Sequence, residues 1–260
     1  MKPIGIFDSG LGGLCALKEL HALMPGTDLI YFGDTGRTPY GTRSAETIMK
    51  YANQDARFLL SQNVCAVLIA CGTVSTVALN ALKLTLPVPV YGVVSAASVE
   101  AAKVTKNGKI GVTGTGATIG SGVFEHELKL INGDFEVYSA ACPLLVPIVE
   151  YGFSDDEIAY LAVKKYVDPL TEKGVDTVIL GCTHFPILKK VMEKAAPGVT
   201  FIDSGAAAAR KIASEFRDCD GEGTVHCYVS DTPSNFNKTA GVFLGKDFDF
   251  DVKRIDIEAY

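Results

Sequence analysis

Short apolar runs alternate with longer stretches of helical spacing along most of the chain. The apolar runs, which we predict to be strands, are residues 3–7, 28–32, 65–70, 88–93, 109–113, 135–139, 175–180, 199–203 and 224–230. The longer stretches, which contain good helix formers and are predicted to be helices, include residues 14–24, 44–62, 96–106, 154–173 and 205–217. Several strands are apolar throughout instead of alternating, as expected for parallel strands that are covered on both faces.

This alternation predicts an α/β fold with doubly wound parallel sheets. In such sheets, ligands bind beyond the carboxyl ends of the strands. Asp8, Cys71 and Cys182 each stand at or just after the end of a predicted strand. We therefore expect the chemistry of this protein to lie at these three positions.

The chain also contains a weak internal repeat. "IGIFDSGLGG" (4–13) opens the first half and "IGVTGTGATIG" (110–120) opens the second. Each half then leads to a strand that ends in cysteine, in "VLIACGTVST" (67–76) and "TVILGCTHFP" (177–186). Two related halves that face each other would bring both cysteines into one cleft.

We predict two α/β domains related by a pseudo-two-fold axis, with the active site in the cleft between them. The first domain comprises residues 1–95 plus 205–260, and the second comprises residues 96–204. The tail after residue 205 is expected to return and pack on the first half.

Composition narrows the class of protein. The chain has 260 residues, of which 48 % are hydrophobic and 21 % charged, and this is typical of a globular protein with a substantial core. The net charge is −6 and no basic stripe is present, so we expect no nucleic-acid partner. The uncharged stretch 58–82 is interrupted by polar residues, and the N-terminal apolar run is broken by Asp8. We therefore expect neither a membrane span nor a secretory signal.

The seven cysteines are odd in number and form no C-x-x-C pair, which favours reduced thiols and a cytoplasmic location. We interpret four of them as small buried hydrophobes and a fifth, Cys142, as structural. The four are Cys15, Cys65, Cys219 and Cys227.

The motifs of this chain do not match the sequence signatures of nucleotide-binding, cysteine-phosphatase or zinc sites. The spacing in "GTGATIGSG" (114–122) is one residue longer than a dinucleotide fingerprint, and "DSGLGG" (8–13) lacks the Lys-Ser/Thr of a P-loop. The second stretch is either a tight turn or a turn whose N–H groups hold a carboxylate. A cysteine phosphatase needs an arginine six positions after its thiolate, where this chain has Val77 and Leu188. Zinc is not expected, because no second pair joins Cys182 and His184.

Two facing thiols suit one kind of reaction. Inversion of a carbon that bears an acidic hydrogen needs a base on one face and an acid on the other. Thiolate is a good base near neutral pH, and a thiol is an adequate acid. A thiol hydrolase built on Cys182 and His184 would leave Cys71 without a role. The duplication therefore favours a pair of acid/base thiols over two packed strand ends, with Asp8 and His184 as the neighbours that tune them.

Six motifs, taken in order, resemble those of glutamate racemase over nearly the full chain. They are "FDSGLGGL" (7–14), "YFGDTGRTPYG" (31–41), "LIACGT" (68–73), "ACPLLVPIVEYG" (141–152), "LGCTHFP" (180–186) and "FIDSGAAAAR" (201–210). The resemblance implies a cytosolic isomerase without cofactor or metal that interconverts L- and D-glutamate and supplies D-glutamate for peptidoglycan. It also implies two α/β halves with pseudo-two-fold symmetry.

The resemblance further implies roles for individual residues. Cys71 and Cys182 would be the acid/base thiols, assisted by Asp8, Glu150 and His184. The residues expected to line the glutamate site are Asp8, Ser9, Tyr40, Gly41, Gly72, Thr73, Thr183 and His184. This chain departs from the family at Gly72, where Asn is frequent, and at Ser95-Ala96-Ala97, where a Pro-Gly step is usual.

Two other functions stay open beside this one. An aspartate racemase of the same superfamily tends to continue its second cysteine motif with Thr-Glu, whereas this chain has Thr183-His184. A non-catalytic amino-acid-binding protein on the same scaffold would need no thiol on each face. A nicotinamide oxidoreductase is a distant third. If the protein forms an oligomer, we expect a homodimer.

Overall fold

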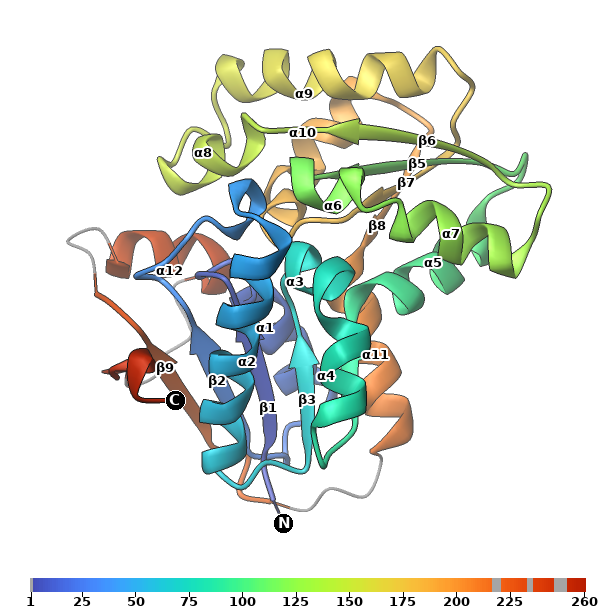
Figure 1. Cartoon of the computed structure of the whole chain (residues 1–260). Helices are drawn as coiled ribbons and strands as arrows, with labels where there is room; N and C mark the ends of the chain where they lie inside the picture. The colour runs from blue at the N-terminus through green and yellow to red at the C-terminus, as the bar shows by residue number, and fades with distance from the viewer. Residues whose placement is uncertain (1, 217–220, 233–235, 246–251) are drawn as a thin grey trace.

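The computed structural model describes residues 2–216, 221–232, 236–245 and 252–260. Its strands form two sheets in which all pairs are parallel (Figure 1). The larger sheet has the order β10-β9-β2-β1-β3-β4, and the smaller has the order β6-β5-β7-β8. The predicted α/β fold with parallel sheets is therefore confirmed.

The strands of the larger sheet are β1 (Ile4–Asp8), β2 (Leu29–Gly33), β3 (Ala66–Ile69), β4 (Val90–Gly92), β9 (Val225–Val229) and β10 (Val252–Arg254). Those of the smaller sheet are β5 (Lys109–Gly114), β6 (Glu136–Ala141), β7 (Thr177–Leu180) and β8 (Thr200–Asp203). All nine predicted strands are present. The tenth strand, β10, was not predicted, because its three residues include two charged ones.

The helices are α1 (Leu14–Leu23), α2 (Ala45–Ser61), α3 (Gly72–Val77), α4 (Leu79–Thr85), α5 (Val93–Val104), α6 (Gly116–Gly120), α7 (Val123–Ile131), α8 (Leu145–Glu150), α9 (Glu157–Thr171), α10 (Lys189–Ala195), α11 (Ser204–Glu215) and α12 (Phe236–Leu244). Three short 3-10 helices are η1 (Tyr40–Thr42), η2 (Phe185–Leu188) and η3 (Ile257–Ala259). The five predicted helices correspond to α1, α2, α5, α9 and α11. Helix α5 begins at Val93, directly after β4, and not at residue 96 as predicted.

The internal repeat is visible in the strand order. Within each sheet, four strands occur in the order second, first, third and fourth along their half of the chain: β2-β1-β3-β4 and β6-β5-β7-β8. The third strands, β3 and β7, are the ones that lead into Cys71 and Cys182. Strands β9 and β10 of the tail extend the larger sheet beside β2. The two cysteines therefore occupy equivalent positions in the two halves.

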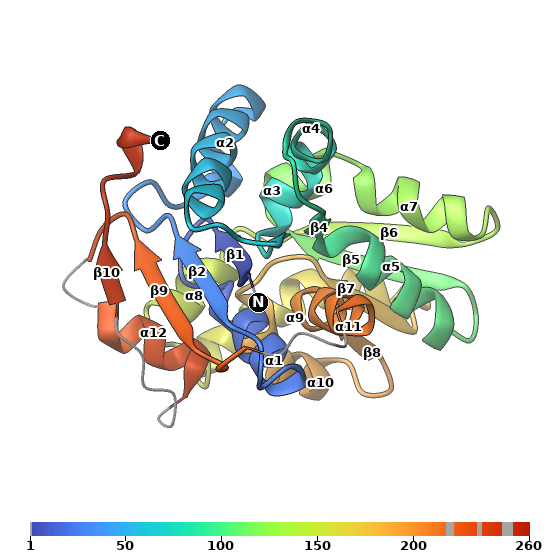
Figure 2. The same ribbon diagram turned by 90° about the horizontal axis from the view of Figure 1, so that it is seen from below.

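Both faces of the larger sheet are covered. In β1, Ile4 and Ile6 pack in one hydrophobic cluster with α1, and Phe7 packs in another with α2. Seen from below, α2 lies on one side of this sheet, and α1 and α12 lie on the other (Figure 2). This two-sided burial explains why β1, β2 and β3 are apolar without alternation.

Local sequence also fixes where helices begin. Ser44 accepts a hydrogen bond from the N–H of Thr47 at the start of α2, and Asp203 accepts one from Ala206 at the start of α11. Such caps satisfy the N–H groups that a helix leaves unpaired at its first turn. Among the described residues, no helix combines the length and apolarity that crossing a membrane requires.

The chain passes from the larger sheet to the smaller through α5 and returns through α11, and these two helices pack against each other. The strands of the larger sheet come from residues 4–92 and 225–254, and those of the smaller sheet from residues 109–203. The exact domain boundaries at 95 and 205 stay a prediction.

Candidate active site

The two cysteine-bearing strand ends meet between the sheets. A Cβ atom built on Gly72 would overlap the carbonyl oxygen of Gly181. Gly72 follows Cys71, and Gly181 precedes Cys182, so both thiols lie beside one contact between the halves. Both are buried, with Cys71 5 % and Cys182 7 % exposed.

Cys71 is held as a thiol. Its Sγ donates a hydrogen bond to Ser9 Oγ at 3.3 Å. Burial raises the pKa of Cys71 to about 12, and the charge of Asp8 contributes in the same direction. Cys71 therefore carries its proton at neutral pH and can act as the acid.

Cys182 has a different partner. Its Sγ lies 3.9 Å from Nδ1 of His184, and Nε2 of the same ring lies 3.0 Å from Oε1 of Glu150. Burial alone would lower the pKa of His184, but Cys182 and Glu150 outweigh it and raise that pKa to about 10. At neutral pH the ring is therefore cationic, and a cation next to a thiol stabilises the thiolate. Phe243 of α12 packs its ring against His184 with centroids 5.2 Å apart and planes at 88°.

Asp8 lies at the end of β1 and is fully buried. One carboxylate oxygen accepts the N–H of Gly10 at 3.0 Å, and the other, Oδ1, has no hydrogen-bond partner among the residues described. Burial raises the pKa of Asp8, and the charge of His184 opposes that rise. A buried acceptor without a partner is costly. Oδ1 is therefore free to accept a hydrogen bond from a substrate.

The glycines of "DSGLGG" have a packing role. A Cβ atom on Gly12 would overlap the hydroxyl of Thr183 and come within 2.8 Å of His184 Nδ1. The turn before α1 can therefore lie against the second half only if this position has no side chain. The stretch is therefore a tight turn, and a role of its N–H groups in holding a carboxylate stays a prediction. Its close approach brings Asp8 to the same place as Thr183 and His184.

Three threonine hydroxyls lie together next to Gly72, one from the half that contains Cys71 and two from the half that contains Cys182. Thr73 Oγ1 lies 2.9 Å from Thr115 Oγ1 and 3.4 Å from Thr118 Oγ1. Gly41 packs on Thr115, because a Cβ atom built there would lie 2.8 Å from Thr115 Cβ. Sequence reasoning missed Thr115 and Thr118. The internal repeat could have indicated Thr115. It directly follows β5, just as Ser9 directly follows β1, the equivalent strand of the first half.

Most of the predicted site residues come together, with one exception. The residues around the thiols are Asp8, Ser9, Gly41, Gly72, Thr73, Glu150, Thr183 and His184. The hydroxyl of Tyr40 points elsewhere, into a buried cluster where it bonds Asp34 and Asp55. Only the backbone of Tyr40 remains to line a cleft beside Gly41.

A cavity of about 220 Å³ adjoins the site and is lined by Gly10, Leu11, Thr35, Thr38, Glu150, Phe236 and Thr239. Two of these residues belong to α12, a helix that sequence reasoning did not anticipate. Within the described ranges, no group of three His, Cys, Asp or Glu side chains is placed to hold a metal ion. Cys219 lies outside the described residues. Cys227 is buried as predicted, whereas Cys15 and Cys65 are only partly buried, and none of these three forms a disulfide.

Comparisons with known proteins agree with this geometry. Residues 17–212 match the family described as Asp/Glu/Hydantoin racemase. Glutamate racemase of Geobacter metallireducens is 43 % identical over 99 % of this chain and 98 % of that protein. Glutamate racemase from Francisella tularensis, solved in complex with D-glutamate, is 34 % identical with a TM-score of 0.92, over 100 % of this chain and 99 % of that one. A glutamate racemase isoform from Bacillus anthracis is also 34 % identical, with a TM-score of 0.93 over 98 % of this chain and 97 % of that one. The chain therefore belongs to the Asp/Glu/hydantoin racemase family and, within it, to the glutamate racemases.

Proposed function

We propose that this chain racemises glutamate by a two-base mechanism in which Cys71 and Cys182 act on opposite faces of the α-carbon. The observation that supports it most is the contact between Gly72 and Gly181, which joins two buried thiols at equivalent strand ends. A non-catalytic binding protein would not need a thiol in each half.

The two thiols have environments that suit complementary roles. Cys182, beside cationic His184, is the base that removes the α-proton, and a C–H bond breaks as an S–H bond forms. Cys71, whose pKa is raised to about 12, is the thiol that returns a proton to the opposite face. Turnover leaves Cys71 ionised and Cys182 protonated, which is the state that processes the other enantiomer.

The neighbouring groups bind and orient the substrate. The hydroxyls of Thr73, Thr115, Thr118 and Thr183 are donors that suit a carboxylate. Asp8 Oδ1 is the acceptor that suits the α-ammonium group, because it is buried and has no partner among the described residues. Glu150 keeps His184 in place and cationic through its 3.0 Å contact with Nε2.

We place this activity in the cytoplasm, where D-glutamate is supplied for peptidoglycan. The support is chemical: none of the six cysteines that the structure describes forms a disulfide, as expected in a reducing compartment. The activity on glutamate itself follows from membership of the glutamate racemases.

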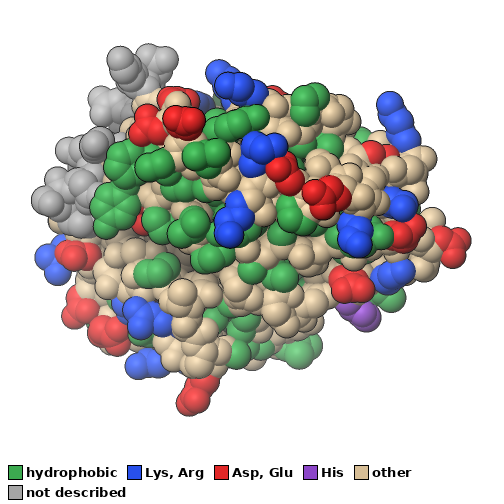
Figure 3. Space-filling view, turned by 90° about the horizontal axis from the view of Figure 1, so that it is seen from above, with side chains coloured by type: hydrophobic (Ala, Val, Ile, Leu, Met, Phe, Trp, Pro, Cys, Tyr) green, Lys and Arg blue, Asp and Glu red, His purple; other side chains and the backbone are tan. Residues whose placement is uncertain are grey.

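We also propose a homodimer formed through α8 and α9. Hydrophobic side chains gather on the face seen in Figure 3. The exposed apolar residues here are Leu144 directly before α8, Tyr151 and Phe153 between the two helices, and Ile158 and Leu161 in α9. An exposed apolar patch of this kind is typical of an interaction surface, and a second copy of the same surface would cover it symmetrically. Light scattering is expected to give twice the chain mass of 27.6 kDa, and a monomer at high concentration would contradict the dimer.

Substrate choice gives the direct test of the function. We expect kcat/KM for L-glutamate to exceed that for L-aspartate by about a hundredfold or more. Aspartate is one methylene shorter, so its α-carbon cannot lie between the thiols while its far carboxylate is held, and a displacement of about 1 Å can cost this much. Chiral chromatography without added cofactor measures both rates. Comparable rates, or a preference for aspartate, would contradict the glutamate assignment.

A further inference from the structure

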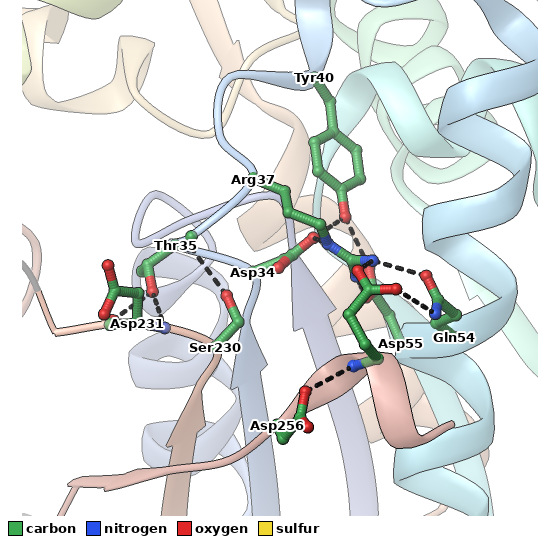
Figure 4. Close-up of polar contacts among 11 residues, drawn as sticks. Asp34, Thr35, Arg37, Tyr40, Gln54, Asp55, Ser230, Asp231 and Asp256 are labelled. Atoms are coloured by element: carbon green, nitrogen blue, oxygen red, sulfur yellow. Dashed lines mark hydrogen bonds and ion pairs between the residues drawn. The ribbon is translucent and has the colours of Figure 1, made fainter.

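A cluster of buried charges lies behind the loop that connects β2 to α2 (Figure 4). Asp34 follows β2 directly, Asp55 lies in the middle of α2, and both side chains have no exposed surface. Arg37 lies between them and is only 12 % exposed. The hydroxyl of Tyr40 reaches the same two carboxyl groups from the other end of the loop. Four charged or polar groups therefore share one interior site near a loop that reaches the active site.

The guanidinium of Arg37 is bonded at every nitrogen. Nε donates to Asp34 at 2.6 Å, and one terminal nitrogen donates to Asp55 at 3.1 Å. The other terminal nitrogen donates to Gln54 at 2.5 Å and to Glu258 of η3 at 3.0 Å. The flat face of the group lies 4.1 Å from the centre of the Tyr51 ring. A lysine cannot reproduce this planar set of contacts, because its ammonium has no fork and no flat face.

The cluster contains two buried carboxyl groups for a single buried cation. Burial and the charge of Asp34 raise the pKa of Asp55 well above its ordinary value. The hydroxyl of Tyr40 is directed at both carboxyl groups, as donor to Asp34 and, at 3.1 Å, to Asp55. The hydroxyl of Tyr40 is thereby satisfied on both sides and fixed in direction.

The same loop is fixed at its beginning by separate contacts with the end of β9. Thr35 Oγ1 donates to the carbonyl of Asp231 and accepts its N–H, at 2.5 and 3.0 Å. Gly36 N–H donates to Ser230 Oγ at 2.8 Å. These contacts hold residues 35 and 36, so the position of the far end of the loop depends on the Arg37 cluster.

That far end is the η1 turn, which lies against the hydroxyls of the active site. Gly41 packs on Thr115, and Thr115 is hydrogen-bonded to Thr73, two residues after Cys71. A shift of the Tyr40–Gly41 turn would therefore move the wall of the site on the side of Thr73 and Thr115.

We propose that Arg37, together with Asp34 and Asp55, is a positioning cluster that holds the Tyr40–Gly41 turn at the substrate site, and that Glu258 of the C-terminal turn supports it. This inference rests on the proposed function, because it assigns a role at that site. The cluster acts through the turn and not on the reacting atoms. Its loss is therefore expected to weaken substrate binding more than proton transfer.

Arg37→Lys is the first test, because it keeps the charge and removes the fork. We expect KM for glutamate to rise by about tenfold or more while kcat changes by about threefold or less, because the turn contributes binding that is common to the ground state and the transition state. Tyr40→Phe should raise KM similarly, and the double variant should add little to either single one. Glu258→Gln, at a side chain 59 % exposed, should raise KM in the same direction but by less than Arg37→Lys does.

Arg254→Lys is the matched control. Arg254 is 65 % exposed on β10 and contacts Asp231 at 3.6 Å, outside the cluster, so wild-type kinetics are expected. Thermal melting is measured for every variant. A lower melting temperature for Arg37→Lys with unchanged KM would show that the cluster only stabilises the fold and would overturn the inference. Wild-type protein that fails to racemise glutamate would instead contradict the proposed function, so the two failures are distinguishable.

Discussion

Cys182→Ser is expected to lower kcat/KM for glutamate by at least about a hundredfold, which is the usual loss when a positioned acid or base is removed. Serine is nearly isosteric with cysteine, so the protein should fold, but its hydroxyl does not ionise near neutral pH. Cys182 Sγ lies 3.9 Å from His184 Nδ1, the neighbour that suits this cysteine to the role of the base. The two enantiomers are equal in free energy, so the loss must be the same in both directions.

Cys71→Ser should show a loss of the same order, because the acid on the other face is then missing. Cys65→Ser is the matched control: Cys65 precedes β3, whereas Cys71 follows it, and only Cys71 contacts Ser9 in the site. We expect Cys65→Ser to retain most of the activity. Wild-type turnover in either Cys71→Ser or Cys182→Ser would contradict the role given to that thiol.

Gly72→Ala should reduce kcat by about a hundredfold, because the added methyl group would force the two cysteine-bearing strand ends apart by a distance on the order of 1 Å. The atom that it would overlap is the carbonyl oxygen of Gly181, which belongs to the backbone and cannot rotate away. Steady-state kinetics on the purified variant measure the effect.

Gly116→Ala is the control for that substitution. Gly116 is the first residue of α6 after β5, as Gly72 is the first residue of α3 after β3, but a Cβ atom there meets nothing within 4 Å. The same methyl group should therefore be tolerated. If Gly72→Ala were as active as Gly116→Ala, the thiols would not depend on the close approach of the two halves.

The main framework of the fold could be predicted because it depends on local patterns. Apolar runs buried on both faces predicted nine strands, and the repeat of a strand followed by cysteine placed Cys71 and Cys182 at equivalent ends. Since parallel strands expose their carboxyl ends at one edge, Asp8 could be placed near Cys71 without a structure. Each of these inferences needed only a few consecutive residues.

The remaining features depend on contacts between distant segments. Arg37 bonds Glu258, and Thr73 bonds Thr115, and neither pair leaves a periodic pattern in the sequence. The same holds for Phe243, whose contact with His184 comes from a helix in the tail. Tyr40 could be assigned to the site by resemblance, but the direction of its hydroxyl is set by Asp34 and Asp55.

The most direct measurement of the two-base mechanism is the fate of the α-hydrogen in deuterated water. L-glutamate is incubated with the protein, the enantiomers are separated early in turnover, and mass spectrometry gives the deuterium in each. With Cys71 and Cys182 on opposite faces, the D-glutamate formed should carry deuterium from solvent, while the remaining L-glutamate should stay almost unlabelled. Equal early labelling of both enantiomers would show that a single base returns the proton to either face, and would contradict the mechanism.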